Sequence, residues 1–106
     1  MNTDYQPYQQ QPLCRIEVTA SYPPIMFFYA LVRANIEING YKQSYPWGTQ
    51  HFDVPPGDYE VAVSYQWVLG AWGRNAVRFR IGPQETRRVN YMASYIRFLP
   101  GSIKVS

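Results

Sequence analysis

The residues of this chain with the strongest intrinsic reactivity are its single cysteine, Cys14, and its single histidine, His51. A thiolate nucleophile needs a neighbouring base and a third group that orients the base, and these two residues alone do not make that set. Alternation along the chain predicts Cys14 on the buried face of one strand and His51 on the solvent side of another. We therefore favour packing for Cys14, with a Cys14–His51 pair as the alternative.

Two carboxylates, Asp53 and Asp58, flank the double proline at residues 55–56. Paired carboxylates can act as the acid and base of a hydrolase, but Asp residues beside a turn more often accept hydrogen bonds from the turn backbone. The chain has no glycine-rich phosphate loop, and one cysteine with one histidine cannot form a structural zinc cluster. We predict a protein that is not an enzyme and expect neither a cofactor nor a metal.

Three arginines, Arg78, Arg80 and Arg88, lie on either side of a predicted turn at residues 82–85. If that turn closes a hairpin, Arg80 lies opposite Arg88, and Arg78 shares their face. Like charges opposite one another destabilise a sheet, so such a cluster favours an anion or an acidic partner. The alternative is that these arginines only keep a sheet face soluble.

Residues 68–74 are predicted to form a loop that contains two glycines, Leu69 and Trp72, and ends at Arg74. Leu69 and Trp72 must either fold over the end of the domain or stay partly exposed. A tryptophan beside an arginine is typical of the residues that dominate protein interfaces. This loop is therefore a candidate binding surface.

A run of apolar residues at 23–29 includes Phe27 and Phe28. We predict a strand here that is buried on both sides, by the partner sheet or by another protomer. An open edge strand with this composition would promote association. The complete candidate partner-binding set is Leu69, Trp72, Arg74, Phe27 and Phe28.

The elements that must position these side chains are β-strands. Residues 58–67 alternate between apolar and polar side chains, which is the pattern of a strand with one buried face. Asn39-Gly40 is a strong hairpin signal because both residue types tolerate positive φ. Further strands are predicted at residues 14–20, 29–38, 41–45, 49–54, 75–81, 86–95 and 102–105.

Seven or eight short strands with turn signals between them predict an all-β fold with little or no helix. We expect a single immunoglobulin-like or prealbumin-like β-sandwich of about 7–8 antiparallel strands. The side chains expected to fill its core are Val61, Val63, Tyr65, Phe79 and Tyr91.

Length and composition indicate one domain. The chain has 106 residues, of which 46% are apolar and 17% aromatic, enough to bury a core. Residues 1–12 are rich in Gln, Pro and Tyr and are expected to be a disordered tail, leaving 13–106 as the domain. We find no secretory signal and no apolar run that would span a membrane, and expect a cytoplasmic protein. The net charge of +3 is only mildly basic.

The segment from residue 36 to 63 resembles the PEGA-type and related prealbumin-like β-sandwich modules of bacterial proteins. The matching residues are Ile36, Ile38, Asn39, Gly40, Phe52, Val54, Pro56, Gly57, Tyr59, Val61 and Val63. The resemblance implies an accessory or surface-interaction module and no catalysis. The Pro-Glu-Gly-Ala element that names the family is missing.

These observations favour a non-catalytic protein-interaction or assembly module that self-associates or docks onto a larger assembly. The second hypothesis is anion or nucleic-acid binding through Arg78, Arg80 and Arg88, with nearby aromatic rings stacking on bases. Peripheral membrane contact near Phe27 and Phe28 is a third and less favoured hypothesis.

Overall fold

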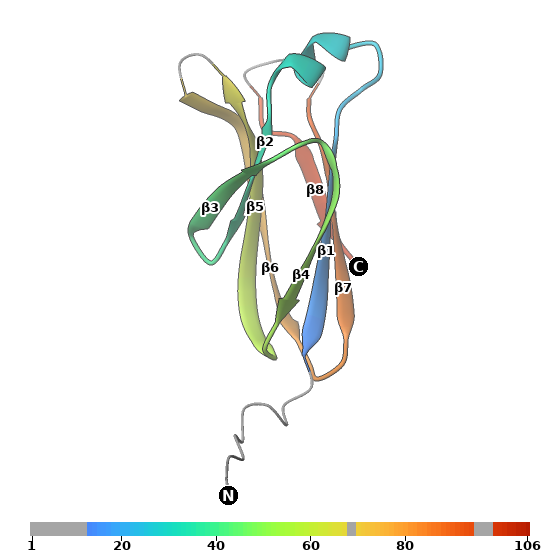
Figure 1. Cartoon of the computed structure of the whole chain (residues 1–106), viewed down its shortest axis with the longest axis vertical. Helices are drawn as coiled ribbons and strands as arrows, with labels where there is room; N and C mark the ends of the chain where they lie inside the picture. Colours follow the sequence, from blue (N-terminus) through green and yellow to red (C-terminus); the bar gives the residue numbers. More distant parts are fainter. Residues whose placement is uncertain (1–12, 68–69, 95–98) are drawn as a thin grey trace, which may run out of the picture.

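The computed structural model describes residues 13–67, 70–94 and 99–106, which are almost entirely β-structure (Figure 1). The strands are β1 (Cys14–Ser21), β2 (Ala34–Ile38), β3 (Tyr41–Tyr45), β4 (Gly48–Val54), β5 (Gly57–Trp67), β6 (Gly70–Ile81), β7 (Thr86–Met92) and β8 (Ser102–Val105). One short 3-10 helix, η2 (Phe27–Leu31), precedes β2. The predicted tail at residues 1–12 lies outside the described residues.

The strands form two sheets of four, in the orders β4-β1-β7-β8 and β3-β2-β5-β6. Neighbouring strands are antiparallel except β1 and β7, which are parallel. The expectation of a purely antiparallel fold is therefore wrong for this pair. Successive strands alternate in direction along the chain, so β1 and β7, both odd in number, must run the same way when they become neighbours.

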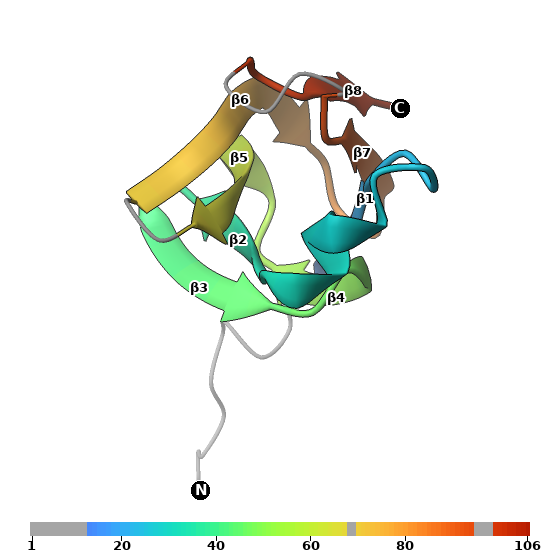
Figure 2. The same ribbon diagram turned by 90° about the horizontal axis from the view of Figure 1, so that it is seen from above.

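The two sheets face each other around a common core, and their edges approach closely enough to give a ring-like outline in the end view (Figure 2). On one side the chain passes directly from β3 of one sheet to β4 of the other. On the other side the backbone N–H of Gly101, just before β8, donates to the carbonyl of Gly73 in β6 at 3.0 Å. The structure is a β-sandwich-like fold in which the chain crosses between the sheets on one side and a backbone hydrogen bond joins them on the other.

The core contains the side chains that alternation predicted. Along β1, every second residue from Cys14 to Ala20 is buried, and β5 contributes Val61, Val63 and Tyr65. Tyr91 enters the same cluster from β7. Phe79 is half-buried against this core, with the Arg87 guanidinium carbon 5.2 Å from its ring centroid. The predicted buried face is confirmed for all five residues.

The Asn39-Gly40 hairpin is also confirmed. Its φ angles are 51° at Asn39 and 85° at Gly40, the positive values that a two-residue turn requires if it is to match the twist of the flanking strands. The register pairs Ile38 with Tyr41 directly across the turn. The Asn39 side-chain oxygen then accepts a hydrogen bond from the backbone N–H of Glu60 at 2.8 Å, which extends the contact between hairpin and β5.

The predicted strand at residues 23–29, continuing through 29–38, is wrong in its first half. The chain there makes local hydrogen bonds three residues apart: Met26 N–H donates to the carbonyl of Pro23, and Tyr29 N–H donates to that of Met26. These bonds produce a turn followed by η2, and β2 begins only at Ala34. The two successive prolines have no backbone N–H to donate to a neighbouring strand. Their presence favours a turn with local hydrogen bonds over an edge strand.

The predicted loop at residues 68–74 is likewise too long. Gly70 and the four residues after it belong to β6, which pairs with β5 up to Trp67–Gly70. The register shifts between Val63 and Tyr65, opposite Gly73, whose φ of +70° supplies the left-handed conformation common at a β-bulge. The bulge lets the long β5–β6 hairpin bend without breaking its pairing.

Candidate interaction surface

Four connections lie at one end of the sandwich, because strand direction carries β1, β3, β5 and β7 toward it and β2, β4, β6 and β8 away from it (Figure 1). The first of them exposes three large apolar side chains: Ile25 at 76%, Phe27 at 75% and Leu31 at 86%. We call this end the apolar end and define it by Ile25, Phe27, Leu31, Trp67 and Trp72. Neighbouring apolar side chains this exposed make the apolar end a candidate contact surface.

Tyr29 anchors the segment that carries these side chains. Its ring is completely buried, and its hydroxyl donates to the carbonyl of Ser94 at 2.8 Å. The indole N–H of Trp47 donates to the carbonyls of Tyr29 and Val32, each at 2.9 Å. Because successive residues of a 3-10 helix lie about 120° apart, a side chain two positions from the buried Tyr29 points to another side of η2. Phe27 and Leu31 are the large side chains of η2 that stay exposed.

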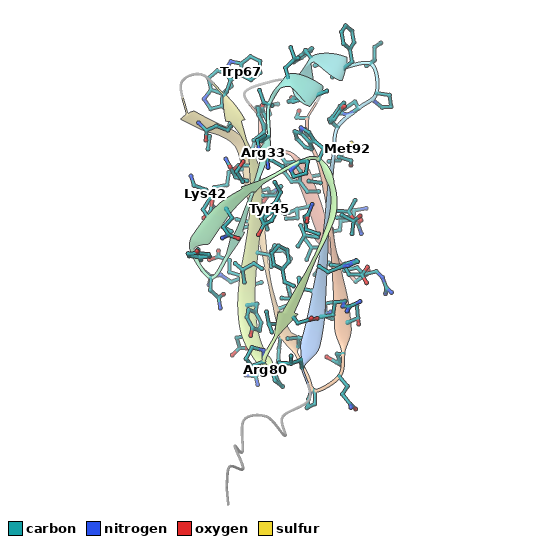
Figure 3. The ribbon with its side chains drawn as sticks, in the orientation of Figure 1. Arg33, Lys42, Tyr45, Trp67, Arg80 and Met92 are labelled. Atoms are coloured by element: carbon teal, nitrogen blue, oxygen red, sulfur yellow. The ribbon has the colours of Figure 1, made fainter. Side chains whose placement is uncertain are left out.

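The tip of the β5–β6 hairpin contributes the aromatic part of the apolar end. The rings of Trp67 and Trp72 stack with centroids 6.1 Å apart and an interplanar angle of 25°. Trp67 lies at the same end as η2 (Figure 3). A groove of about 270 Å³ joins the two elements, and it is lined by Leu31, Val32, Arg33, Ser44, Gln66 and Trp67.

The structure separates the predicted partner-binding residues. Phe27 is exposed as a contact residue must be, but Phe28 is half-buried and stacks on Tyr29 at 5.1 Å. Trp72 is also half-buried against the core. Arg74 lies further along β6 and pairs with Glu37 at 3.3 Å. Leu69 lies outside the described residues.

Sequence reasoning missed Ile25, Leu31 and Trp67. The sequence carried no usable signal for this arrangement, because Phe27, Tyr29 and Leu31 alternate and would share one face of a strand. The structure instead buries Tyr29 and exposes the other two. Trp67 ends the alternating segment at residues 58–67, where it is half-buried and forms part of a groove wall.

The predicted arginine face does not exist. Residues 82–85 connect β6 of one sheet to β7 of the other, so Arg80 is not opposite Arg88. Arg80 pairs with Asp58 at 3.0 Å, and Arg78 pairs with Glu60 at 3.4 Å, both across the β5–β6 hairpin. Arg88 pairs with Glu17 of β1 at 3.5 Å. Each of the three guanidinium groups therefore lies beside a cross-strand carboxylate.

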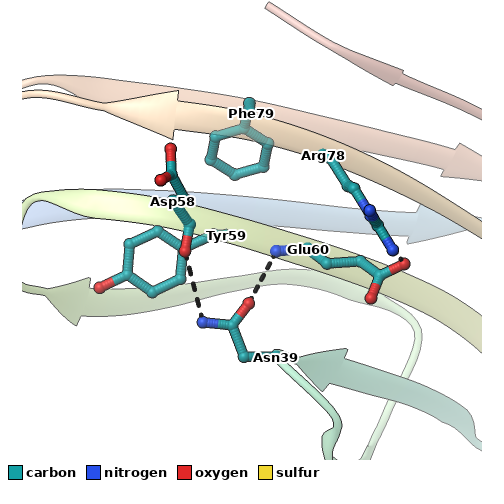
Figure 4. A pocket seen from close by; sticks show the side chains of 6 residues that line it. All are labelled: Asn39, Asp58, Tyr59, Glu60, Arg78 and Phe79. Carbon is teal, nitrogen blue, oxygen red and sulfur yellow. Dashed lines mark hydrogen bonds and ion pairs between the residues drawn. The ribbon is translucent and has the colours of Figure 1, made fainter.

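A second, more polar groove of about 470 Å³ lies beside these ion pairs (Figure 4). It is lined by Asn39, Asp58, Tyr59, Glu60, Arg78 and Phe79. The Tyr59 hydroxyl donates to the carbonyl of Pro55 at 2.6 Å, and burial, followed by the neighbouring Cys14, raises the pKa of Tyr59. The arginine and both carboxylates are engaged in ion pairs, and no nucleophile among the lining residues contacts a base.

Cys14 and His51 lie on opposite faces of their sheet. Cys14 is buried and its thiol donates to the carbonyl of Gly82 at 2.8 Å. His51 is exposed, with its Nε2 atom 3.9 Å from a carboxylate oxygen of Glu17. The predicted orientations are confirmed for both residues, and this arrangement does not form a Cys–His pair. Within residues 13–67, 70–94 and 99–106, no three His, Cys, Asp or Glu side chains gather as a possible metal site.

Comparison of the chain with protein-family models, curated proteins and solved structures finds no match. Across the part of the chain that the structure describes, no helix is both long and apolar enough to cross a membrane. The class that fold and surface define is therefore a small, nearly all-β domain of two four-stranded sheets with an exposed apolar end.

Proposed function

We propose that this protein is a non-catalytic interaction module that docks through its apolar end. The observation that carries the proposal is the exposure of Ile25, Phe27 and Leu31, each at least 75% accessible, on a segment held by the buried anchor Tyr29. Leaving such side chains in water costs free energy that contact with an apolar surface recovers. A rigid anchor beneath them limits the conformational entropy lost on binding.

The rest of the molecule supports a binding role. The polar groove beside Asn39 is bordered by charges that already pair with one another. Cys14 is engaged with a backbone carbonyl in the core. The apolar end, in contrast, leaves Ile25, Phe27 and Leu31 exposed. Exposed apolar side chains suit binding better than they suit chemistry.

The proposal also covers the fold family and the cellular location of the protein. We assign the chain to the prealbumin-like or immunoglobulin-like β-sandwiches, on the support of its two four-stranded sheets and the turn-and-strand pattern at residues 36–63. We also propose a cytoplasmic location, supported by the single cysteine left as a free thiol.

The test is a triple substitution, Ile25→Ser, Phe27→Ser and Leu31→Ser, in the full chain. Because these side chains make few core contacts, the variant should keep the parent's circular dichroism and unfolding midpoint. It should lose the parent's binding, measured by light scattering for self-association, by pull-down for proteins and by flotation for vesicles.

The matched control is Leu13→Ser together with Tyr41→Ser, which removes exposed apolar surface (58% and 70% accessible) away from the apolar end. The control should bind like the parent. A folded triple variant that retains every interaction of the parent would show that the apolar end is not the contact surface.

A further inference from the structure

The expectation of a protein partner or self-association at residues 23–29 depended on an open edge strand, which the structure does not contain. The apolar residues there lie instead on a turn and a short 3-10 helix. A second connection adds Trp67, and a third adds Leu99, which is 48% exposed between β7 and β8. Three connections therefore bring apolar side chains to one end.

The types and the exposure of the side chains at the apolar end indicate what kind of partner they contact. Residues that dominate protein interfaces are enriched in Trp, Tyr and Arg, and Leu is under-represented among them. The large apolar side chains most exposed here are instead Ile25, Phe27 and Leu31. A lipid interface accepts separate, protruding apolar side chains without needing a complementary pocket.

The distribution of charge favours the same partner. All acidic residues of the chain lie outside residues 18–36, 42–52, 61–84 and 86–106, which supply the four connections at the apolar end. The described carboxylates Glu17, Glu37, Asp53, Asp58 and Glu60 instead pair with cations on the strands. The apolar end therefore presents no carboxylate that would repel an anionic surface.

Arg33 is the cation closest in sequence to the exposed segment, two residues after Leu31. Its exposed side chain donates to Ser44 from Nε at 2.9 Å, and it takes part in none of the six ion pairs among the described residues. Arg33 lines the same groove as Leu31 and Trp67. A guanidinium beside an apolar group and an indole suits a phosphate at the boundary between headgroups and acyl chains.

We infer that the apolar end docks onto the interface of an anionic lipid bilayer, with Ile25, Phe27 and Leu31 entering the acyl boundary and Arg33 meeting lipid phosphates. This inference rests on the proposed function and names its partner. Trp67 lies at headgroup depth, which suits the amphipathic indole ring. The orientation places the outer strands with their ion pairs away from the membrane.

The experiment is flotation of the full chain with vesicles of phosphatidylcholine, with and without phosphatidylserine. The parent should float with the mixed vesicles, and its tryptophan emission should shift to the blue and be quenched by brominated lipid. The triple serine variant should reduce partitioning by about tenfold or more, since several buried CH₂ groups are lost. Arg33→Gln should reduce it about fivefold on mixed vesicles only, while Arg33→Lys should keep it near the parent's value.

The controls separate this inference from the proposed function. Leu13→Ser with Tyr41→Ser should float like the parent, and if the triple variant unfolds, Phe27→Ser alone should still weaken flotation. A parent that ignores both vesicle types but self-associates or captures a protein through Ile25, Phe27 and Leu31 would overturn the lipid partner and leave the interaction module standing. A parent that does neither overturns both. Equal flotation of parent and triple variant overturns insertion by the apolar end.

Discussion

The hydroxyl of Tyr91 donates a hydrogen bond of 2.5 Å to the carbonyl of Gly73, and these two residues belong to different sheets. The backbone N–H of Gly101 donates to the same carbonyl at 3.0 Å. The amide of Asn75 donates to the carbonyl of Gly101 at 2.8 Å. These bonds close the edge between β6 and β8, one residue from Trp72, so that the same contacts support the fold and the hairpin tip of the apolar end.

Gly73→Ala should destabilise the protein strongly. A Cβ atom at this position would lie 2.4 Å from Cε1 of Tyr65 and 2.9 Å from the Tyr91 hydroxyl, and the φ of +70° is already unfavourable for alanine. Both aromatic rings are buried and have no free space to move into. We expect a loss of about 3 kcal/mol in the free energy of unfolding, measured by urea denaturation.

Gly40→Ala is the matched control for backbone strain. Gly40 has a similar φ of +85°, but an added Cβ would meet nothing within 4 Å. The cost should be about 1 kcal/mol, from the left-handed backbone alone. Equal losses in the two variants would contradict the steric role assigned to Gly73.

Tyr91→Phe should change how stability depends on pH. Burial, followed by the nearby Tyr29, raises the pKa of Tyr91 above its ordinary value of 10.0. Below pH 10 the hydroxyl is protonated in both the folded and unfolded states, so its stabilising contribution is complete. Above that pH the unfolded state loses the proton first, and stability falls as the pH rises.

Above pH 10 the free energy of unfolding should fall with pH more steeply in the parent than in the Phe variant. The difference in slope should approach about 1.4 kcal/mol per pH unit, the value for one proton. Tyr59, whose pKa is also raised, remains in the variant, so a smaller slope should persist. At neutral pH the substitution should cost only about 1 kcal/mol, because Gly101 still donates to the Gly73 carbonyl. Denaturation at several pH values measures both effects, and identical slopes would refute the assignment.

Trp47→Phe should loosen the segment that presents the apolar end. Phenylalanine keeps most of the ring packing but removes the N–H that bonds to Tyr29 and Val32. Hydrogen exchange should accelerate at the amides of Met26, Tyr29 and Val32, which the local turn bonds protect in the parent. Exchange at Val63 and Val89, deep in the core, serves as the internal reference and should change much less.

The ion pairs can be tested by double-mutant cycles. Arg80→Gln and Asp58→Asn should be coupled by about 0.2–1 kcal/mol, the range for exposed pairs, since both side chains are largely accessible. Arg80→Gln and Arg88→Gln should be additive within about 0.3 kcal/mol because the residues lie in different sheets. A clear repulsive coupling between the two arginines would restore the arginine face predicted from the hairpin.

Local patterns were sufficient for several elements. The alternation in residues 58–67 predicted β5 and its inward face, but not that Ala62 and Ser64 on the opposite face are buried as well. The positive φ that Asn39-Gly40 tolerates predicted the hairpin. Both signals depend on the conformations and burial of residues that are close in the chain. For the candidate site, the same reasoning found Phe27 but not Leu31 or Ile25, because an apolar run does not by itself distinguish a buried strand from an exposed helical turn.

What the sequence determined, then, was which residues form strands and which of their faces avoid water, since backbone preferences and side-chain alternation act over a few residues. Only the tertiary structure decided that residues 82–85 cross between sheets and that Arg80 therefore meets Asp58 instead of Arg88. It also decided that Tyr29 fills the core and turns Phe27 and Leu31 outward. Strand partners are chosen by the free energy of burying both sheet faces together, a property of the whole packed core that no single segment encodes.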